Sequence, residues 1–252
     1  MRMKGMVAIV TGGASGFGEG ICHAYARQGA RVVVSDIDET RGAGVAQELR
    51  AAGADAQFCR ADVSRRDDVE RLVAGALARF GRLDVMVNNA GHCHRNGPML
   101  SVTEEEFDRV FQVNVKSLYL SALSCVPVFR KQGGGVFVNV ASTGGVRPRP
   151  GLTWYNGSKG AAIVLTKSMA VELAPDRIRV NAIAPVLGAT GMLTTAMGVD
   201  DTPANRARFT ASIPLGRLSL PADVAHAAVF LAEPGSEFIT GVCLEVDGGR
   251  CV

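Results

Sequence analysis

Short apolar runs alternate along this chain with longer segments in which apolar residues recur at helical spacing. The runs are continuous stretches of apolar or β-branched residues, which is typical of strands that are buried on both faces. We predict seven such strands, at residues 6–10, 31–35, 55–59, 83–87, 135–140, 178–183 and 242–246. The segments between them predict helices near 17–28, 39–52, 65–80, 103–132, 153–174 and 221–232.

The regular alternation of strands and helices predicts the fold class. A strand that is followed by a helix and a second strand forms a parallel pair with a right-handed crossover, and the helices then cover both faces of the sheet. We therefore expect an α/β protein: a single Rossmann-like, doubly wound domain with a seven-stranded parallel sheet. A length of 252 residues fits one such domain, 1–252, and no internal repeat or linker divides it.

One long segment, 186–220, carries no clear pattern of either kind. A stretch of that length inside a compact domain is usually functional, so we expect a substrate loop or lid over about 186–213. Its large apolar residues, which form either a mobile cover or ordinary packing, are Met192, Leu193, Met197 and Phe209.

Composition and charge exclude several classes of protein. Hydrophobic residues make up 47% of the chain and charged residues 20%, so a large core can form and disorder is not expected. The net charge of +3 comes without a basic run, so we expect no nucleic-acid partner. No apolar run reaches membrane-spanning length, and the first apolar stretch is too short for a signal peptide. Six cysteines without a C-x-x-C pair indicate free thiols, and we expect a cytoplasmic protein without a membrane partner.

A glycine-rich turn, Thr11 to Gly18, follows the first predicted strand and opens the first helix. Glycines at positions 12, 16 and 18 allow the backbone to turn tightly and to approach a pyrophosphate, which the N-terminus of the helix attracts. The alternative is an ordinary loop between a strand and a helix. The position of the turn between a strand and a helix favours a dinucleotide site.

The second strand ends in an acidic residue, Asp36, 18 residues after Gly18. A carboxylate at that place accepts hydrogen bonds from both hydroxyls of an adenosine ribose, and it repels a 2′-phosphate. Neither Ser15 nor Ile37 offers a positive charge for such a phosphate. The alternative role for Asp36 is a helix cap or turn residue. We predict NAD rather than NADP.

Tyr155 and Lys159 are four residues apart in a helical pattern, so their side chains share one face. An ammonium close by, with ribose hydroxyls between the two side chains, favours the phenolate, and it is expected to lower the pKa of the tyrosine from its usual value of about 10. Ser142 ends the fifth strand, at the edge of the sheet where ligands bind, and can hydrogen-bond a substrate oxygen. A Tyr–Lys pair alone is a common surface arrangement, so the interpretation depends on further motifs.

Further motifs follow one another along the whole chain. They are the turn from Thr11 to Gly18, Asp62-Val63, Asn88-Asn89-Ala90-Gly91, Asn114, Ser142, Tyr155 with Lys159, Asn181 with Pro185, Ile239-Thr240-Gly241, and Asp247-Gly248-Gly249. With these motifs in this order, the chain resembles the short-chain dehydrogenase/reductase family in its compact, single-domain form.

The resemblance implies a role for each matched residue. Tyr155 is then the general acid–base, Ser142 orients the substrate carbonyl, and Lys159 binds the nicotinamide ribose. Asn114 is expected to hold a water that links Lys159 to solvent as a proton relay. The implied cofactor-binding residues are Gly12, Ser15, Gly16, Phe17, Gly18, Asp36, Asp62, Val63, Asn89, Ala90, Gly91, Tyr155, Lys159, Pro185 and Thr190. The family also implies a homotetramer, built through the helices near 103–132 and 153–174 and the segment 239–252.

The chain departs from the family pattern after the sixth strand. Many members have glycine after the proline there, whereas here Pro185 precedes Val186, so the path of the 186–192 loop is open. Gly157, between the Tyr and the Lys, stands where members often have alanine, and it weakens the helix by about 1 kcal/mol.

Two further groups of residues have alternative interpretations. The sequence His92-Cys93-His94 is compatible with a metal site, but it lacks an acidic fourth ligand nearby, so we expect a loop beside the substrate and no metal. Arg147 and Arg149 either recognise an anionic substrate or are solvated loop residues, and we favour the second.

Taken together, the sequence predicts an NAD-dependent oxidoreductase that interconverts a small secondary alcohol, polyol or sugar-like substrate and its ketone by hydride transfer. The nearest alternative is a 3-oxoacyl-(acyl carrier protein) reductase, a reaction that normally draws on NADPH, against which Asp36 argues. A catalytically silent nucleotide-binding protein is the third hypothesis, and the complete set of four catalytic residues argues against it.

Overall fold

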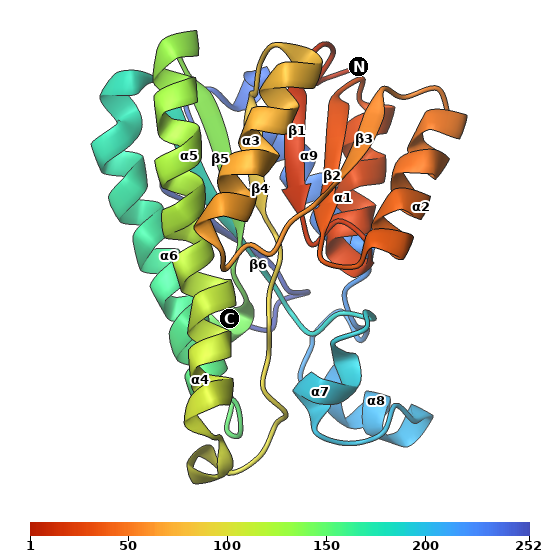
Figure 1. Ribbon diagram of the computed structural model, residues 1–252. Coiled ribbons are helices and arrows are strands. Elements are labelled where there is room, and N and C mark those ends of the chain that lie inside the picture. Colours follow the sequence, from red (N-terminus) through yellow and green to blue (C-terminus); the bar gives the residue numbers. More distant parts are fainter.

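The computed structural model describes all 252 residues and contains one seven-stranded parallel sheet (Figure 1). The strand order is β3-β2-β1-β4-β5-β6-β7. The strands are β1 (Val7–Thr11), β2 (Arg31–Asp36), β3 (Ala56–Arg60), β4 (Val85–Asn88), β5 (Gly135–Val140), β6 (Ile178–Pro185) and β7 (Cys243–Val246). The order reverses between β1 and β4, and ligands of open α/β sheets bind in the crevice that such a reversal leaves at the carboxyl ends of the strands.

Three helices pack on each face of the sheet. The buried cluster on one face combines strand residues with α1 (Gly16–Arg27), α2 (Glu39–Ala51) and α9 (Pro221–Ala232). The cluster on the other face combines them with α3 (Arg66–Phe80), α5 (Ser117–Gln132) and α6 (Thr153–Leu173). Figure 1 shows α3 and α5 in front of the strands and α9 behind them. The predicted fold class, a doubly wound single sheet covered on both faces, is confirmed.

Strand β1 shows why the strands are continuous apolar runs. Ala8 and Val10 belong to the cluster with α1, whereas Val7 and Ile9 belong to the cluster with α3. Successive side chains of a strand point to opposite faces of the sheet. Helices cover both faces and shield them from water, so the residues of β1 must be apolar on either side.

Most predicted strand boundaries lie within one residue of the observed ones, with two exceptions. Strand β4 begins at Val85, two residues later than predicted, and just before it the carboxylate of Asp84 accepts a hydrogen bond from the Val7 amide at 2.8 Å. Strand β6 continues two residues further, to Pro185, and the Val186 amide still bonds to Val246.

The predicted helix over 103–132 is wrong in one respect, because it is interrupted. It consists of α4 (Glu104–Phe111), a π-helical segment η2 (Gln112–Lys116) and α5. Thr103 caps α4 by accepting a hydrogen bond from the Glu106 amide. The π-helical segment contains Asn114, and π-helical turns are frequent at functional sites.

The segment 186–220 contains two short helices, α7 (Leu193–Met197) and α8 (Pro203–Thr210). Figure 1 shows both beyond the end of the sheet, across from α4. Leu193 and Met197 are buried in a separate small cluster together with Val186, so these residues pack the segment itself. Val186 does not adopt a positive φ, and the position therefore has no need of glycine.

Four short 3-10 turns complete the chain: η1 (Met99–Ser101), η3 (Thr143–Gly145), η4 (Ala174–Asp176) and η5 (Pro234–Ser236). None of the helices combines the length and the apolar character that crossing a bilayer requires.

Candidate active site

A cleft of about 490 Å³ lies along the carboxyl ends of the central strands. Every cofactor-binding residue predicted from the sequence lines it, with the exception of Gly18. These lining residues are Gly12, Ser15, Gly16, Phe17, Asp36, Asp62, Val63, Asn89, Ala90, Gly91, Tyr155, Lys159, Pro185 and Thr190. The fold therefore brings residues from across the sequence together at the predicted edge of the sheet.

The glycine turn owes its shape to two positive φ angles, 64° at Gly12 and 58° at Gly16. A side chain at Gly12 would come within 2.8 Å of the side-chain nitrogen of Asn89, so the turn has no room for a larger residue at this position. Gly18 lies behind the turn, where a Cβ would overlap the carbonyl of Gly12. Ser15 precedes α1 without a side-chain cap, which leaves the first-turn amides of the helix free to bind an anion.

The motif after β4 ties this turn to the neighbouring strand. The Asn89 side chain donates to the carbonyl oxygens of Thr11, at 2.8 Å, and Gly12, at 3.1 Å. The Thr11 hydroxyl in turn accepts hydrogen bonds from the amides of Asn89 and Ala90. These bonds fix the two loops that border the reversal of strand order.

Asp36 ends β2 with its carboxylate at the cleft. One oxygen accepts a hydrogen bond from the Ala14 amide at 3.0 Å, and the other accepts one from the Asp38 amide at 3.1 Å. Asp36 therefore both holds the turn and lines the cleft, whereas the cap of α2 is Asp38. The only cations that line the cleft are Arg109 and Lys159, so none stands beside Asp36 in the cleft wall.

Tyr155 and Lys159 lie on one face of α6, as predicted. The Lys159 ammonium donates to the Val140 carbonyl at 2.8 Å and lies 5.9 Å from the centre of the Tyr155 ring. Ser142 follows β5, and its hydroxyl accepts a hydrogen bond from the Gly144 amide at 3.0 Å. Ser142 and Tyr155 also line a second, smaller pocket that adjoins the cleft. The two pockets share a wall, which consists of Phe17, Tyr155, Thr190 and Met192.

Burial governs the ionisation of both groups. It raises the pKa of Tyr155 above its ordinary value, and the hydrogen bond with Ser142 and the charge of Arg149 oppose this rise. Burial also lowers the pKa of Lys159 to about 8. The expected lowering of the tyrosine pKa involves ribose hydroxyls between Tyr155 and Lys159, and it stays a prediction. In the protein alone the ammonium bonds to the Val140 carbonyl, and burial governs the pKa of Tyr155.

Asn114 is 3% exposed and lines neither pocket. Its amide oxygen accepts from the His92 amide at 2.8 Å, and its nitrogen donates to the His92 carbonyl at 2.8 Å and the Ser158 hydroxyl at 2.9 Å. A side chain at Gly91 would lie about equally near Asn114, at 3.5 Å, and Lys159, at 3.6 Å. The π-helical segment thus places Asn114 directly behind the loop that borders Lys159.

The side chains of His92, Cys93 and His94 point to three different partners. The His92 ring lies 2.9 Å from the Glu106 carboxylate, and the Cys93 thiol donates to the His94 carbonyl at 3.2 Å. The His94 ring contacts the carbonyl of Arg95. Burial raises the pKa of Cys93 to about 12, which keeps the thiol protonated. His92 lines the cleft, and a position of this loop beside the substrate stays a prediction.

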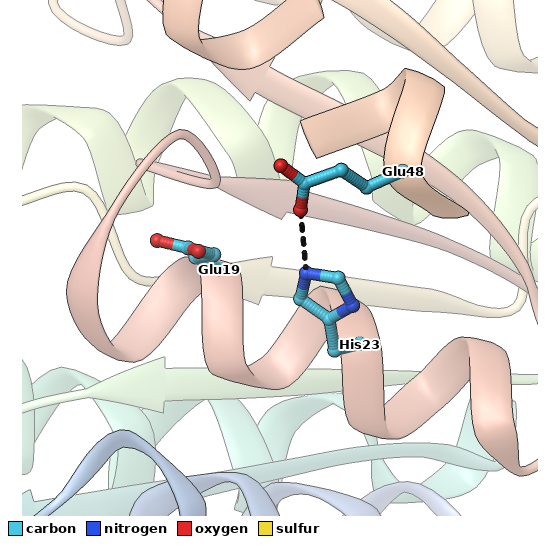
Figure 2. Close-up of side chains that lie close together, drawn as sticks. All are labelled: Glu19, His23 and Glu48. Carbon is cyan, nitrogen blue, oxygen red and sulfur yellow. Dashed lines mark ion pairs between the residues drawn. The ribbon is translucent and has the colours of Figure 1, made fainter. Parts of the chain in front are cut away.

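A different group of side chains that could bind a metal ion lies between α1 and α2. Figure 2 shows His23 paired with Glu48, at 3.5 Å, and Glu19 one helical turn before His23. None of the three side chains lines either pocket. The ion pair joins two helices that cover the same face of the sheet.

Several residues that line the cleft escaped the sequence analysis. Some are neighbours of the motifs and follow from them, namely Ile37, Ala61, Ser64, Val140, Ala141 and Gly191. Others come from α4 and the π-helical segment, namely Arg109, Gln112 and Val113. Nothing in the sequence indicated Arg109, Gln112 and Val113, because they belong to none of the motifs and the π-helical segment is not visible in the hydrophobic pattern.

The chain matches known proteins over nearly its whole length. A family model described as enoyl-(acyl carrier protein) reductase matches residues 12–250. A 4-formylbenzenesulfonate dehydrogenase of Comamonas testosteroni is 54% identical over 250 residues, with 99% of each chain covered. A cyclopentanol dehydrogenase of a Comamonas strain is 38% identical over 248 residues, with 98% of each chain covered. A solved structure of a 3-ketoacyl-(acyl-carrier-protein) reductase from Brucella melitensis, complexed with NADH, has a TM-score of 0.92 at 46% identity and covers 99% of this chain and 100% of that chain.

Proposed function

Because the chain belongs to the short-chain dehydrogenase/reductase family, we propose that this oxidoreductase uses NAD(H) to interconvert a small alcohol and its carbonyl compound. Secondary alcohols and their ketones are the expected pair. The observation that carries the proposal is the common wall of the two pockets, because Tyr155 borders both the cleft and the pocket that contains Ser142. A proton donor at that position can reach a molecule in either space.

The cleft fits a dinucleotide, which, when bound, supplies or takes up the hydride. The glycine turn and the uncapped N-terminus of α1 suit a pyrophosphate, because the free amides of the first helical turn attract an anion. The turn packs against Asn89 without room for a side chain at Gly12, so it needs glycine there. Asp36 suits an unmodified ribose, and a 2′-phosphate would meet a carboxylate with no cation in the cleft wall beside it. The NADH in the Brucella reductase supports the same choice.

The protein's own residues supply the acid–base chemistry. In the proposed mechanism Tyr155 gives a proton to the carbonyl oxygen during reduction and removes it during oxidation, while the Ser142 hydroxyl donates a hydrogen bond to the same oxygen. Lys159 is charged below a pH of about 8, and its charge helps a phenolate to form when both groups face the substrate. Asn114 holds the backbone of His92 in place behind this group, and the proton relay that it is expected to support is part of the proposal.

A 3-oxoacyl-(acyl carrier protein) reductase is the second candidate, and the similarity to the Brucella reductase favours it. That relative is complexed with NADH, so a preference for NAD does not separate the two functions. The other two relatives are dehydrogenases of an aromatic aldehyde and of a cyclic alcohol, and they favour compact substrates. The apolar lining of the second pocket, which includes Leu152, Leu187 and Leu193, fits such compact bodies.

A substrate panel tests the proposal. Purified enzyme is assayed for NADH formation with cyclic alcohols, benzyl alcohols, polyols and acyclic secondary alcohols, and for NADH oxidation with acetoacetyl-coenzyme A as a stand-in for the acyl-carrier substrate. We expect turnover of compact alcohols with NAD. A higher kcat/KM for acetoacetyl-coenzyme A than for every alcohol and ketone would establish the second candidate instead. Absence of turnover with all compounds would support a silent nucleotide-binding protein.

A homotetramer is part of the proposal. Large apolar side chains are exposed on α5, where Tyr119 is 56% exposed, and on α6, where Val171 is 80% exposed. Phe238, just before β7, is fully exposed. The exposed apolar side chains on α5 and α6, and that of Phe238 before β7, support interfaces at both places, and a tetramer of this family needs two interfaces.

A further inference from the structure

Arg149 lies in the pocket that contains the proposed acid–base residue. It stands in the loop between η3 and α6 and lines the second pocket together with Ser142 and Tyr155. Every other residue that lines this pocket is uncharged. The half-buried guanidinium is therefore the only source of charge in the wall of the pocket.

The guanidinium of Arg149 has no polar partner within the protein. The guanidinium takes part in no ion pair and donates no hydrogen bond to another residue of the protein. Its carbon lies 5.5 Å from the centre of the Phe209 ring of α8, and stacking on an aromatic face orients a guanidinium without using its N–H groups. All five donors of the fork are thus left for a molecule that enters the pocket.

The backbone of Arg149 is fixed by a hydrogen bond, although its guanidinium has no hydrogen-bond partner. The Asn156 side chain donates to the Arg149 carbonyl at 2.9 Å, and Asn156 follows Tyr155 directly on α6. Asn156 is 8% exposed, so this bond is shielded from water. The backbone from which the Arg149 side chain extends is therefore fixed relative to the tyrosine, and the stacking on Phe209 orients the guanidinium.

Arg147 provides a comparison two residues away. It is exposed, lines neither pocket, and donates to the carbonyl oxygens of Arg250, at 2.9 Å, and Val252, at 3.1 Å. The two arginines flank Pro148 in one short loop, but one is engaged with the C-terminal segment and the other faces the pocket. The sequence alone does not reveal which of the two arginines faces the pocket.

An unpaired cation in this environment favours an anion. Burial and the neighbouring charge of Arg250 lower the pKa of Arg149, so the positive charge is held there at a cost. An oxyanion that approaches the fork relieves that cost, and a guanidinium pairs with carboxylate or sulfonate oxygens through two parallel hydrogen bonds. The attraction is stronger here than at the surface because apolar residues, including Leu152 and Met192, line the same pocket and lower its polarity.

We propose that Arg149 is the anion-binding residue of the substrate pocket, and that the preferred substrate is a compact alcohol or carbonyl compound bearing a carboxylate or sulfonate. The proposal rests on the proposed function, because the reacting carbon is taken to lie at Tyr155 and Ser142. The apolar side chains between them and Arg149 contact a hydrocarbon body, such as an aromatic or alicyclic ring. Phe209 keeps the guanidinium in position and is a positioning residue.

Matched substrates test the proposal. The rate of NADH oxidation is measured with 4-formylbenzoate, 4-formylbenzenesulfonate and 4-acetylbenzoate, and with the neutral counterparts methyl 4-formylbenzoate, 4-methylbenzaldehyde and 4-methylacetophenone. The variants are Arg149→Gln, Arg149→Lys and, as matched control, Arg147→Gln. We expect Arg149→Gln to lower kcat/KM by about 10- to 100-fold for the anionic compounds, through KM, and by less than about threefold for the neutral ones. Arg149→Lys should recover part of the loss because it retains the charge but not the fork. Arg147→Gln should leave the ratio of anionic to neutral substrates unchanged.

A binding measurement separates failure of this proposal from failure of the proposed function. Titration of toluene-4-sulfonate into the enzyme saturated with NADH should show binding to the wild type and to Arg147→Gln, and about 10-fold or weaker binding to Arg149→Gln. Sulfonate binding that depends on Arg149, without turnover of any compound, would retain the anion site and overturn the oxidoreductase assignment. Turnover of neutral compounds with equal effects of Arg149→Gln on both classes would overturn the anion site alone. Equal sulfonate binding by wild type and Arg149→Gln would also overturn it.

Discussion

The ammonium of Lys159 lies 2.8 Å from the carbonyl oxygen of Val140, the last residue of β5. This bond is the only hydrogen bond of a lysine that is 5% exposed and has no carboxylate partner. Folding therefore removes a charge from water with a single backbone oxygen as compensation. The arrangement is unfavourable for stability and is retained where a charge is needed, as in a catalytic site.

Replacement of this lysine should stabilise the protein and inactivate it. A fall of the pKa from 10.5 to about 8 corresponds to roughly 3 kcal/mol of unfavourable free energy for the charged form. Methionine fills a similar volume without a charge, so Lys159→Met should raise the free energy of unfolding at neutral pH by about 1–3 kcal/mol, net of the lost hydrogen bond. Urea unfolding measures the change. A destabilised Lys159→Met would show that the bond to Val140 outweighs the burial of the charge.

The same lysine predicts a pH dependence of stability. Its pKa is lower in the folded protein, at about 8, than in the unfolded chain, at 10.5, so the unfolded chain binds more protons between these values. Stability from this group therefore rises as the pH increases from about 8 to 10.5, and the full penalty applies below about 8. The advantage of Lys159→Met over wild type should shrink across that interval. Thermal unfolding of both proteins at matched pH values checks this, and a gap that does not change with pH would contradict it.

Tyr155→Phe should abolish turnover and leave NADH binding nearly intact. The substitution removes one hydroxyl from the common wall of the two pockets and keeps the ring, so the shape of the cleft is preserved. Loss of a general acid–base lowers kcat by about 100-fold or more. Steady-state assays and fluorescence titration of NADH measure the two effects. Substantial residual turnover would remove Tyr155 from its proposed role.

The choice between NAD and NADP should depend on the charge of Asp36. Asp36→Asn retains an acceptor oxygen for one of the two backbone bonds but loses the negative charge, and we expect kcat/KM with NAD to fall by about 10-fold or more while that with NADP rises. Asp38→Asn is the control, because Asp38 caps α2 and does not line the cleft. A wild-type enzyme that prefers NADP would contradict the assignment of the cofactor.

A charge on the exposed apolar face of α6 should reduce the size of the assembly. Light scattering of the wild type is expected to give the mass of a tetramer. Val171→Lys places an ammonium at a position that is 80% exposed in the single chain, so it should yield dimers without loss of fold. A wild-type monomer, or a variant that remains tetrameric, would contradict the proposed interface.

The sequence predicted the strands and the cleft because each depends on local chemistry. Strand β1 is apolar at every position since both faces are covered, and the glycine turn follows it immediately. The interruption of the helix at Asn114 was not predicted, because a change in backbone hydrogen bonding leaves the hydrophobic pattern intact. The burial that raises the pKa of Tyr155 was not predicted, because a spacing of four residues indicates proximity to Lys159 but carries no information about burial.

The arginines show a second limit of the sequence. Arg147 and Arg149 have nearly the same neighbours along the chain, and their different surroundings arise from residues far away. Arg147 meets the C-terminal segment, whereas Arg149 meets Phe209, 60 residues later in α8. Such contacts depend on how α8 and the C-terminal segment are placed by the fold, and no local pattern encodes that placement.

The shared wall of the two pockets couples their ligands. Phe17 packs so closely against the 186–192 loop that a side chain at Gly188 would overlap its ring, and Thr190 of this loop lies against Gly16. The same loop lines both the cleft and the second pocket, so a molecule in the cleft meets residues that also bound the second pocket. By thermodynamic linkage, the dinucleotide changes the affinity for the alcohol by the same factor by which the alcohol changes the affinity for the dinucleotide. The two spaces should accordingly bind their ligands as a coupled pair and not independently of one another.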